Sequence, residues 1–367
     1  MGFKMKILVL GGTQFNGYHL VRELVRCGHD VTILNRGKTQ ANLPRSVQRL
    51  VCDRTDHDAM RAVLAGQDWD CVHDMTAYQP ADVALMTEIL DGHVGHYVFA
   101  SSTVIYAATN RLPVTEAHPL DRSEEQNEYG LNKILCEDHL LRAHHERAFP
   151  ATIAAFSMVF GPRNILPDRE QRMFMRLLKG RKVMVPGDGT TVGQVGHVED
   201  EARALRSLMQ NPRTFGKRYN LTGGDCYTDE GYVDTFASVL GLEPEKVFIP
   251  HEVMEELWDG RRALGGAVVR ANVDIRTTQR EDRAMSRFRF NLILQRIAPH
   301  LHHWNRSVFF SVDRLREDTG WQPEYSFRGA VEQTWEWMQA EGLDRSLEFD
   351  FDFEDDLLAE IEKRRRA

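Results

Sequence analysis

One stretch decides the fold of this chain: Lys6-Ile-Leu-Val-Leu-Gly-Gly-Thr-Gln-Phe-Asn-Gly17. It begins with a short apolar run, which is typical of a strand buried on both faces of a parallel sheet. Two glycines follow directly, and apolar residues then recur at three- and four-residue spacing, which predicts a helix opening at about Gly17. A glycine turn between a strand and a helix directs the first helix amides at a phosphate group. The stretch therefore predicts a dinucleotide-binding turn.

Each glycine of this turn has an expected role. Gly11 suits the tight turn, and Gly17 lets the helix pack close to the strand. The usual motif has a third glycine between them, where the backbone meets the pyrophosphate, but Gln14 stands there. The alternative is an ordinary turn without a ligand. We favour the dinucleotide because the position and the flanking pattern agree, and we expect cofactor contacts from Gly11, Thr13, Gln14, Phe15, Asn16 and Gly17.

Length, charge and cysteine usage narrow the class of protein. The chain has 367 residues, enough for a nucleotide-binding domain and a smaller one. Its formal net charge of −8 makes nucleic acid an unlikely partner, although a local basic patch stays open. Five scattered cysteines without a Cys-x-x-Cys pair favour free thiols in a reducing compartment. No stretch approaches the ~20 apolar residues of a membrane span and no signal peptide is evident, so we expect a cytoplasmic protein without membrane contact.

A second predicted strand, residues 31–34, ends in Asn35-Arg36-Gly37-Lys38. This place lies about 20 residues beyond the glycine turn, where an acidic side chain would hold the ribose 2′-hydroxyl of NAD and an arginine would suit a 2′-phosphate. The acid is absent, while Arg36 and Lys38 are present. The expected cofactor is therefore NAD or NADP, with NADP slightly favoured. A solvated basic turn is the alternative.

Further predicted strands, residues 47–52, 70–74, 96–100 and 152–156, alternate with helical segments. This alternation predicts an α/β fold with a doubly wound parallel sheet, whose ligands bind beyond the carboxyl ends of the strands. Asp53 stands where a carboxylate could accept the adenine amino group. The other candidate cofactor contacts at these ends are Asn35, Arg36, Lys38, Arg54, Thr76 and Ala77, and Tyr78 is a candidate substrate contact.

The strongest catalytic signal follows the strand at 96–100, which runs into Ser101-Ser102. A helix predicted from about Asn127 carries Tyr129 and Lys133, whose spacing of four places them on one helical face. A lysine ammonium beside a phenol favours the phenolate, so we expect it to lower the pKa of Tyr129. The tyrosine could then exchange a proton with a substrate hydroxyl as a hydride moves to or from nicotinamide, with Ser102 orienting the same oxygen.

Later motifs complete a pattern that resembles a known superfamily. They are Phe160-Gly161-Pro162, Pro186-Gly187-Asp188-Gly189, His197-Val198-Glu199-Asp200, Tyr219-Asn220-Leu221 and Thr319-Gly320-Trp321-Gln322-Pro323. With the glycine turn, Asp53, Ser102, Tyr129 and Lys133, they resemble the extended short-chain dehydrogenase/reductase superfamily, NAD-dependent epimerase/dehydratase type, from Lys6 to about Trp337. The glycine turn, Asn35-Arg36-Gly37 and Cys52-Asp53-Arg54 are most similar to a branch that includes chloroplast stem-loop RNA-binding proteins.

The resemblance implies a Rossmann-type domain at about 1–160, to which some later segments return, a smaller C-terminal α/β substrate domain at about 161–345, and a tail at 346–367. It implies that Tyr129 is the acid/base, that Ser102 takes the serine/threonine role, and that Lys133 also binds the nicotinamide ribose. It further implies a homodimer through the helices at about 127–145 and 81–90. Ile134, Leu141 and Leu85 are the candidate contacts, and the alternative is that they pack on their own sheet.

Two departures from the family pattern bear on the substrate. Dehydratases carry an acidic pair after the serine/threonine position, where this chain has Thr103 and Val104, so dehydration is not expected. Epimerases of UDP-sugars usually have a diphosphate-binding arginine where this chain has Gly193. Candidate substrate contacts are Tyr78, Ser102, Thr103, Arg163 and Gln194, with Arg172 and the Arg261–Arg262 pair as further substitutes for that arginine.

We therefore expect an epimerase that acts on a secondary hydroxyl of a sugar, one joined to a nucleotide, through a transient keto form. The alternatives are an NADPH-dependent sugar or ketone reductase and a non-catalytic nucleotide- or RNA-binding relative. No metal is expected, because His300, His302 and His303 have no acidic partner at ligand spacing. The acidic and then basic tail could form a helix from about Asp355 that docks on a partner subunit, or it could be solvated.

Overall fold

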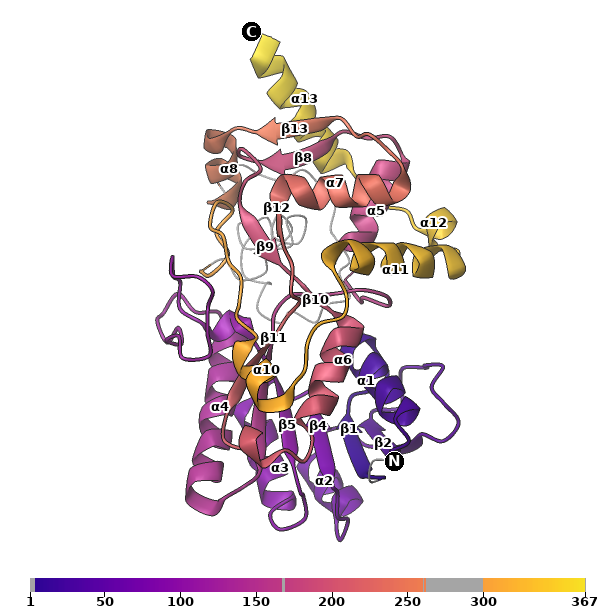
Figure 1. The fold of residues 1–367 in the computed structure, drawn as a ribbon, viewed down its shortest axis with the longest axis vertical. Helices are drawn as coiled ribbons and strands as arrows, with labels where there is room; N and C mark the ends of the chain where they lie inside the picture. Colours follow the sequence, from indigo (N-terminus) through magenta and orange to yellow (C-terminus); the bar gives the residue numbers. More distant parts are fainter. Residues whose placement is uncertain (1–3, 167–168, 260, 262–299, 367) are drawn as a thin grey trace.

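The computed structural model describes residues 4–166, 169–259, 261 and 300–366. The lower half of Figure 1 is a seven-stranded sheet with helices on both faces, and the upper half is a smaller α/β lobe. All neighbouring strands of the sheet are parallel, in the order β11-β6-β5-β4-β1-β2-β3. Their bounds are β1 (Lys6–Leu10), β2 (Asp30–Asn35), β3 (Gln48–Val51), β4 (Cys71–Asp74), β5 (Tyr97–Ser102), β6 (Ala151–Phe156) and β11 (Arg218–Leu221). The predicted doubly wound sheet is confirmed, with the strand order typical of dinucleotide-binding folds.

Strand β1 shows why both faces of this sheet are covered. Ile7 and Val9 pack into one hydrophobic cluster, while Leu8 and Leu10 pack into a second cluster on the other side. The first side is covered by α1 (Phe15–Arg26), α6 (Val198–Leu208) and α10 (Asp313–Thr319). The second side is covered by α2 (His57–Leu64), α3 (Pro80–Ile89) and α4 (Glu128–Arg147). Helices α6 and α10 and strand β11 come from far along the chain, so the sheet lobe is closed by later segments.

The smaller lobe is built from short strand pairs and helices. Its bounds are β7 (Val159–Phe160), α5 (Glu170–Leu178), β8 (Val183–Pro186), β9 (Val192–Gln194), β10 (Gly196–His197), β12 (Cys226–Thr228), α7 (Asp229–Leu240), β13 (Lys246–Ile249), α8 (His251–Trp258), α11 (Phe327–Ala340), α12 (Leu343–Ser346) and α13 (Asp352–Arg366). Short 3₁₀ turns lie at η1 (Thr103–Ile105) and η2 (Pro212–Thr214). Rings from α5, α7 and α11 form an aromatic core, in which Phe174 and Phe236 lie 4.6 Å apart between centroids.

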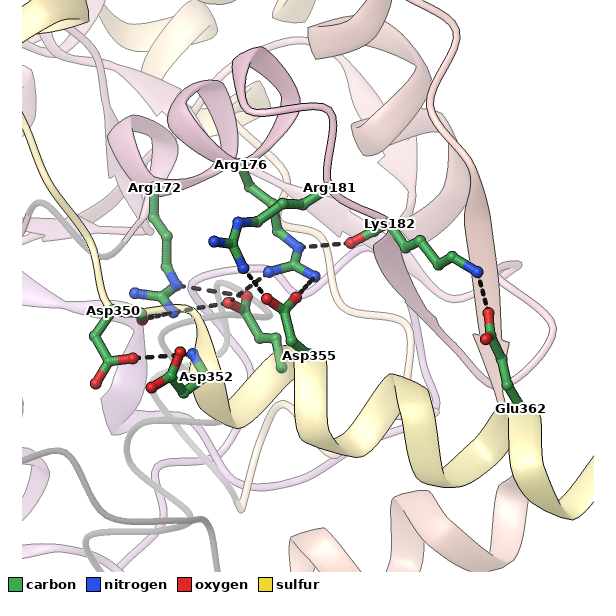
Figure 2. Close-up of polar contacts among 9 residues, drawn as sticks. Arg172, Arg176, Arg181, Lys182, Asp350, Asp352, Asp355 and Glu362 are labelled. Atoms are coloured by element: carbon green, nitrogen blue, oxygen red, sulfur yellow. Dashed lines mark hydrogen bonds and ion pairs between the residues drawn. The ribbon is translucent and has the colours of Figure 1, made fainter.

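The tail is part of this lobe: the expected helix is present, but its apolar side chains pack against its own chain and are not solvated. Helix α13 begins at Asp352, and Phe351, Leu357, Leu358 and Ile361 are buried in the same chain's hydrophobic clusters. Figure 2 shows cations of α5 and the following turn converging on the acidic face of α13. The tail therefore docks on its own chain through apolar burial and buried ion pairs.

Glu354 is the centre of that charged contact. Its Oε2 lies 2.7 Å from Nη2 of Arg172 and 3.1 Å from Nη1 of Arg176. Arg176 also reaches Asp355 at 2.7 Å, and Arg181 pairs with the same carboxylate. Because Glu354 and the Asp350 carbonyl hold Arg172, this arginine does not serve as the substitute diphosphate ligand that the sequence suggested.

The side chains expected at a dimer contact lie inside the chain. Ile134 is fully buried beside η1, and Leu85 packs with Leu141 in the cluster beneath α3 and α4. The alternative, that these residues pack on their own lobe, is the correct one. The exposed apolar side chains of α4 are Leu131 and Leu135, at 39% and 40% exposure. A homodimer stays a prediction. Within the described residues, no helix is long and apolar enough to cross a bilayer.

Candidate active site

The glycine turn has the geometry that its sequence predicts. Gly11 and Gly12 have φ values of +108° and +91°, which favour glycine. A Cβ at Gly17 would lie only 2.5 Å from the backbone nitrogen of Gly12, so helix and turn approach as closely as backbone permits. Gln14 is the exposed, extended N-cap of α1, and its side chain makes no capping bond. The N-terminus of α1 is thus open to an anion.

We expect Gly17→Ala to lower cofactor affinity tenfold or more and to destabilise the fold by about 1–3 kcal/mol, because the new methyl group would displace the backbone of the turn. Cofactor titration monitored by protein fluorescence and thermal unfolding measure the two effects. Gly329→Ala in α11 is the matched control, since its Cβ would meet side-chain atoms alone, the Ser326 hydroxyl at 3.3 Å and a Tyr325 ring carbon at 3.9 Å. Equal cofactor affinity in the two variants would contradict the role given to Gly17.

Polar atoms around the turn fit a dinucleotide. Two buried atoms lack a hydrogen-bond partner, Oδ1 of Asn16 in α1 and Nδ2 of Asn35 at the end of β2. Each such group is costly to bury alone, so a polar ligand beside them would be favourable. Asp53 is exposed just beyond β3, and hydrogen bonds from the backbone and hydroxyl of Thr55 hold its pKa below the usual value. Arg36 and Lys38 are exposed in the neighbouring loop and add to this lowering of the Asp53 pKa.

Arg54 is held inside the protein. Its guanidinium donates to Asp74 at 2.7 Å and 3.1 Å and to Thr76 at 3.0 Å, and it lies 3.3 Å from Asp82. These contacts brace the end of β4 against α3. A methyl group of Thr76 would lie 3.0 Å from a Cβ at Gly11, so the end of β4 borders the glycine turn as expected.

Ser102, Tyr129 and Lys133 converge at the carboxyl end of β5. Asn127 caps α4 by accepting a hydrogen bond from the Gly130 amide at 2.8 Å, which places Tyr129 in the first turn. The Ser102 side chain lies close enough to the Tyr129 hydroxyl to act on its pKa, which it lowers. One turn further, the buried Lys133 ammonium lies 5.6 Å from the centre of the Tyr129 ring.

Lys133 is fixed by the backbone on both sides. Its Nζ donates to the carbonyl oxygens of Ala77 at 2.8 Å and Ala100 at 2.6 Å, which leaves one N–H for a ligand. Ala77 therefore contributes through its carbonyl oxygen, which orients the lysine. Burial lowers the pKa of Lys133 to about 8, so the ammonium form still predominates at neutral pH.

The expected effect of Lys133 on Tyr129 is wrong for this structure. Although Tyr129 is 37% exposed as a residue, its hydroxyl is desolvated, and this raises its pKa above the ordinary value. Tyr78 adds to the rise and the hydrogen bond from Ser102 opposes it, while the lysine has no resolved effect. Tyr129 is therefore a neutral phenol in the ligand-free protein, with its proton available for donation.

The candidate substrate contacts divide into two groups. Tyr78 is 51% exposed with its ring 6.3 Å from that of Tyr129, and Thr103 is buried directly after Ser102. By contrast, Arg163 pairs with Glu341 at 3.2 Å and lies over the Tyr18 ring of α1. The Gln194 amide is engaged at both ends, donating to Gly223 and accepting from Phe310, each at 2.8 Å. The structure thus places Tyr78 beside Tyr129 and Thr103 next to Ser102, whereas contacts elsewhere hold Arg163 and Gln194.

Two candidates remain, the Arg261–Arg262 pair, which lies partly outside the described residues, and the three histidines at 300–303. Arg261 pairs with Asp259 at 3.1 Å, and residue 262 is not described. Of the three histidines, His300 contacts the Val104 carbonyl at 2.8 Å and His303 contacts Asn305 at 2.6 Å, so their imidazoles point to different partners. Across the described ranges, no group of three His, Cys, Asp or Glu side chains is arranged to hold a metal ion.

Glu137, which holds the strand end next to Ser102, was missed by the sequence analysis. Glu137 is buried one turn beyond Lys133 and accepts a hydrogen bond from Ser101, beside Ser102. The signal was present in the spacing, because residues 129, 133 and 137 lie at intervals of four on one face of α4.

Comparison with known proteins shows which family the chain resembles. The model of the NAD dependent epimerase/dehydratase family matches residues 7–222. The chain is 29% identical to the chloroplast stem-loop binding protein of 41 kDa b of Arabidopsis thaliana, over 66% of this chain and 65% of that protein. It is 27% identical to 2′-dehydrokanamycin reductase of Streptomyces kanamyceticus, over 70% and 72% of the two chains. It is 26% identical to UDP-glucose 4-epimerase of Lactobacillus helveticus, over 74% and 94%.

Solved structures agree on the fold. The UDP-glucose 4-epimerase of Thermotoga maritima, crystallised with UDP-glucose, superposes with a TM-score of 0.67 at 19% identity, covering 92% of this chain and 99% of that one. The dTDP-glucose 4,6-dehydratase of Bacillus anthracis, in complex with NAD, gives 0.68 at 16% identity, with 92% and 98% covered.

Proposed function

Because the chain belongs to the NAD dependent epimerase/dehydratase family, we propose that it inverts a secondary hydroxyl of a nucleotide-linked sugar through a transient ketone. The observation that carries this proposal is the convergence of Ser102, Tyr129 and the buried ammonium of Lys133 at the carboxyl end of β5. Relatives named as epimerases of nucleotide sugars support the substrate class. The acidic pair of dehydratases is replaced by Thr103 and Val104, so dehydration is not proposed.

The residues of the site divide the chemistry between them. Tyr129 exchanges a proton with the substrate hydroxyl at its Oη, and Ser102 orients the same oxygen. Lys133 would hold the ribose of the cofactor with its remaining N–H. A bound nicotinamide would supply the acceptor and the donor of the hydride at the carbon that bears the hydroxyl. The glycine turn, Asn16, Asn35 and Asp53 are the residues that would hold the dinucleotide, on the geometry given above.

A one-way NADPH-dependent reductase is the second candidate. Arg36 and Lys38 are exposed where a 2′-phosphate would lie, and the neutral Tyr129 phenol is the form that donates a proton to a carbonyl oxygen undergoing reduction. The relative named 2′-dehydrokanamycin reductase supports this reading.

Isotope transfer separates the two candidates. The purified protein is first analysed by mass spectrometry for a retained cofactor and then screened with nucleotide sugars that carry deuterium on the reacting carbon. An epimerase returns the label to the same carbon without net consumption of cofactor. A reductase transfers deuterium from labelled NADPH to a keto sugar. Absence of both reactions across the screen would contradict the proposed function.

We expect Arg36→Asp to shift cofactor preference toward NAD by tenfold or more, because the new carboxylate would repel a 2′-phosphate and accept a hydrogen bond from a 2′-hydroxyl. Titration of the wild type and the variant with NAD and NADP gives the ratio. Arg49→Asp, on the exposed side of β3, is the control for a general change of charge. An unchanged ratio would remove Arg36 from the cofactor site.

A further inference from the structure

Three side chains on one face of α4 meet the last three residues of β5. The first two are Tyr129 and Lys133, described above. The third is Glu137, whose Oε1 accepts a hydrogen bond from the Ser101 hydroxyl. Since residues four apart lie on one helical face, a single face of α4 contacts the strand end at three successive points. The strand end that carries Ser102 is therefore held at Ala100 and Ser101, the two residues before that serine.

Glu137 is also tied to a third element. It is fully buried, and its Oε2 accepts a hydrogen bond from Nε of Arg218 at 2.7 Å, with a second bond from Nη2 of the same guanidinium. Arg218 belongs to β11, two strands away from β5, and its Nη1 donates to the Glu116 carbonyl at 3.2 Å. One buried carboxylate thus joins α4, β5 and the edge strand of the sheet.

The charge of this carboxylate acts on Lys133. Burial lowers the pKa of the lysine, and Glu137 is among the groups that oppose this change by favouring the ammonium form. The other groups that act on Lys133 are Cys136 from α4, Asp74 from β4, and Arg54 from the turn after β3. The groups around Glu137 are Ser101 from β5, Arg218 from β11, Tyr106 after η1, and Asp138 from α4.

We propose that Glu137 is a positioning residue for the reaction: through Ser101 and Arg218 it fixes the end of β5 against α4, and it places a carboxylate on the face of α4 that carries Lys133. Glu137 touches neither substrate nor cofactor in this arrangement and acts only through Ser102 and Lys133. This inference rests on the proposed function where it is tested by turnover, but the titration of Lys133 tests it independently of that function.

Two substitutions separate geometry from charge. Glu137→Gln keeps the length of the side chain and an oxygen acceptor but removes the charge. We expect the alkaline limb of its turnover profile to move to lower pH by about 0.5–1 unit, since losing a nearby anion disfavours the ammonium form. Glu137→Asp keeps the charge but shortens the reach to Ser101. The alkaline limb of its turnover profile should therefore stay at the same pH, while its turnover falls severalfold. Asp138→Asn, whose carboxylate pairs with the exposed Arg122, is the matched control and should change neither.

A second measurement does not depend on turnover. The protein is labelled with ¹³C at the Cε carbon of lysine. The Lys133 resonance is the one that is missing from the spectrum of Lys133→Arg, and its chemical shift is followed against pH in each variant. It should titrate at lower pH in Glu137→Gln than in the wild type. An unmoved titration in folded Glu137→Gln overturns the inference even if no substrate is found, whereas failure of the substrate screen alone overturns only the proposed function. If Glu137→Gln does not fold, Ser101→Ala decides: turnover equal to the wild type overturns the positioning role.

Discussion

Tyr129→Phe is expected to lose about 10²–10⁴-fold in turnover while binding cofactor with unchanged affinity. The substitution removes only the hydroxyl and leaves the ring beside Tyr78 and Lys133. Substrate binding and the geometry of hydride transfer stay, but the group to which the proposal assigns the proton exchange is lost. Steady-state turnover and cofactor titration measure the two quantities.

Tyr106→Phe is the matched control for this variant. The Tyr106 hydroxyl is buried and donates to Asn220 at 2.6 Å, so its removal should cost about 1–3 kcal/mol of stability with turnover retained. If Tyr129→Phe keeps full activity on an identified substrate, Tyr129 is not the acid/base and the assignment fails.

Glu354→Ala is expected to destabilise the protein by about 3–5 kcal/mol, because two arginines would keep their charge in a buried site after losing the carboxylate between them. The side chains of Arg172 and Arg176 are 9% and 2% exposed, so water cannot replace the lost partner without opening the lobe. Figure 2 shows the site, where both guanidinium groups approach α13 from α5. Urea unfolding followed by circular dichroism gives the free energy.

Asp356→Ala is the control for the loss of a carboxylate from the same helix. Asp356 is exposed, and its removal should change stability by no more than about 0.5 kcal/mol. If the two variants unfold at the same urea concentration, the ion pairs of α13 do not stabilise the lobe and apolar burial alone holds the tail.

Much of the sheet lobe could be predicted because its signals are local. Apolar runs bounded by glycine and polar turns placed β2, β4 and β6 within about a residue or two of their observed ends. The separate roles of Gly11 and Gly17 followed from the motif. The positive φ of Gly11 agrees with the tight turn, and the short distance between Gly17 and the backbone of Gly12 agrees with close packing of the helix. The convergence of Ser102, Tyr129 and Lys133 could be predicted because the end of the strand and the start of the helix could both be located from the sequence.

What could not be predicted depends on partners distant in sequence. Arg54 was a candidate cofactor contact, but Asp74 and Asp82, which come from other elements, hold it. The tail was expected either to dock on a partner subunit or to be solvated, and the arginines that bind it lie about 180 residues earlier in the chain. The Tyr129 phenol was expected to be acidified by Lys133, but desolvation outweighs a cation that two carbonyl groups already engage.

The docking of α13 has a consequence for biosynthesis. Residues of the last helix, such as Leu358 and Ile361, belong to the same buried cluster as Val247 and Ile249 of β13. During translation, segments made early can already fold while later ones are still being synthesised. The sheet lobe can therefore form before α13 is made. The smaller lobe cannot close until residues 351–361 have left the ribosome, and a chain cut shortly before residue 351 would leave its arginines and apolar surface exposed to chaperones and proteases.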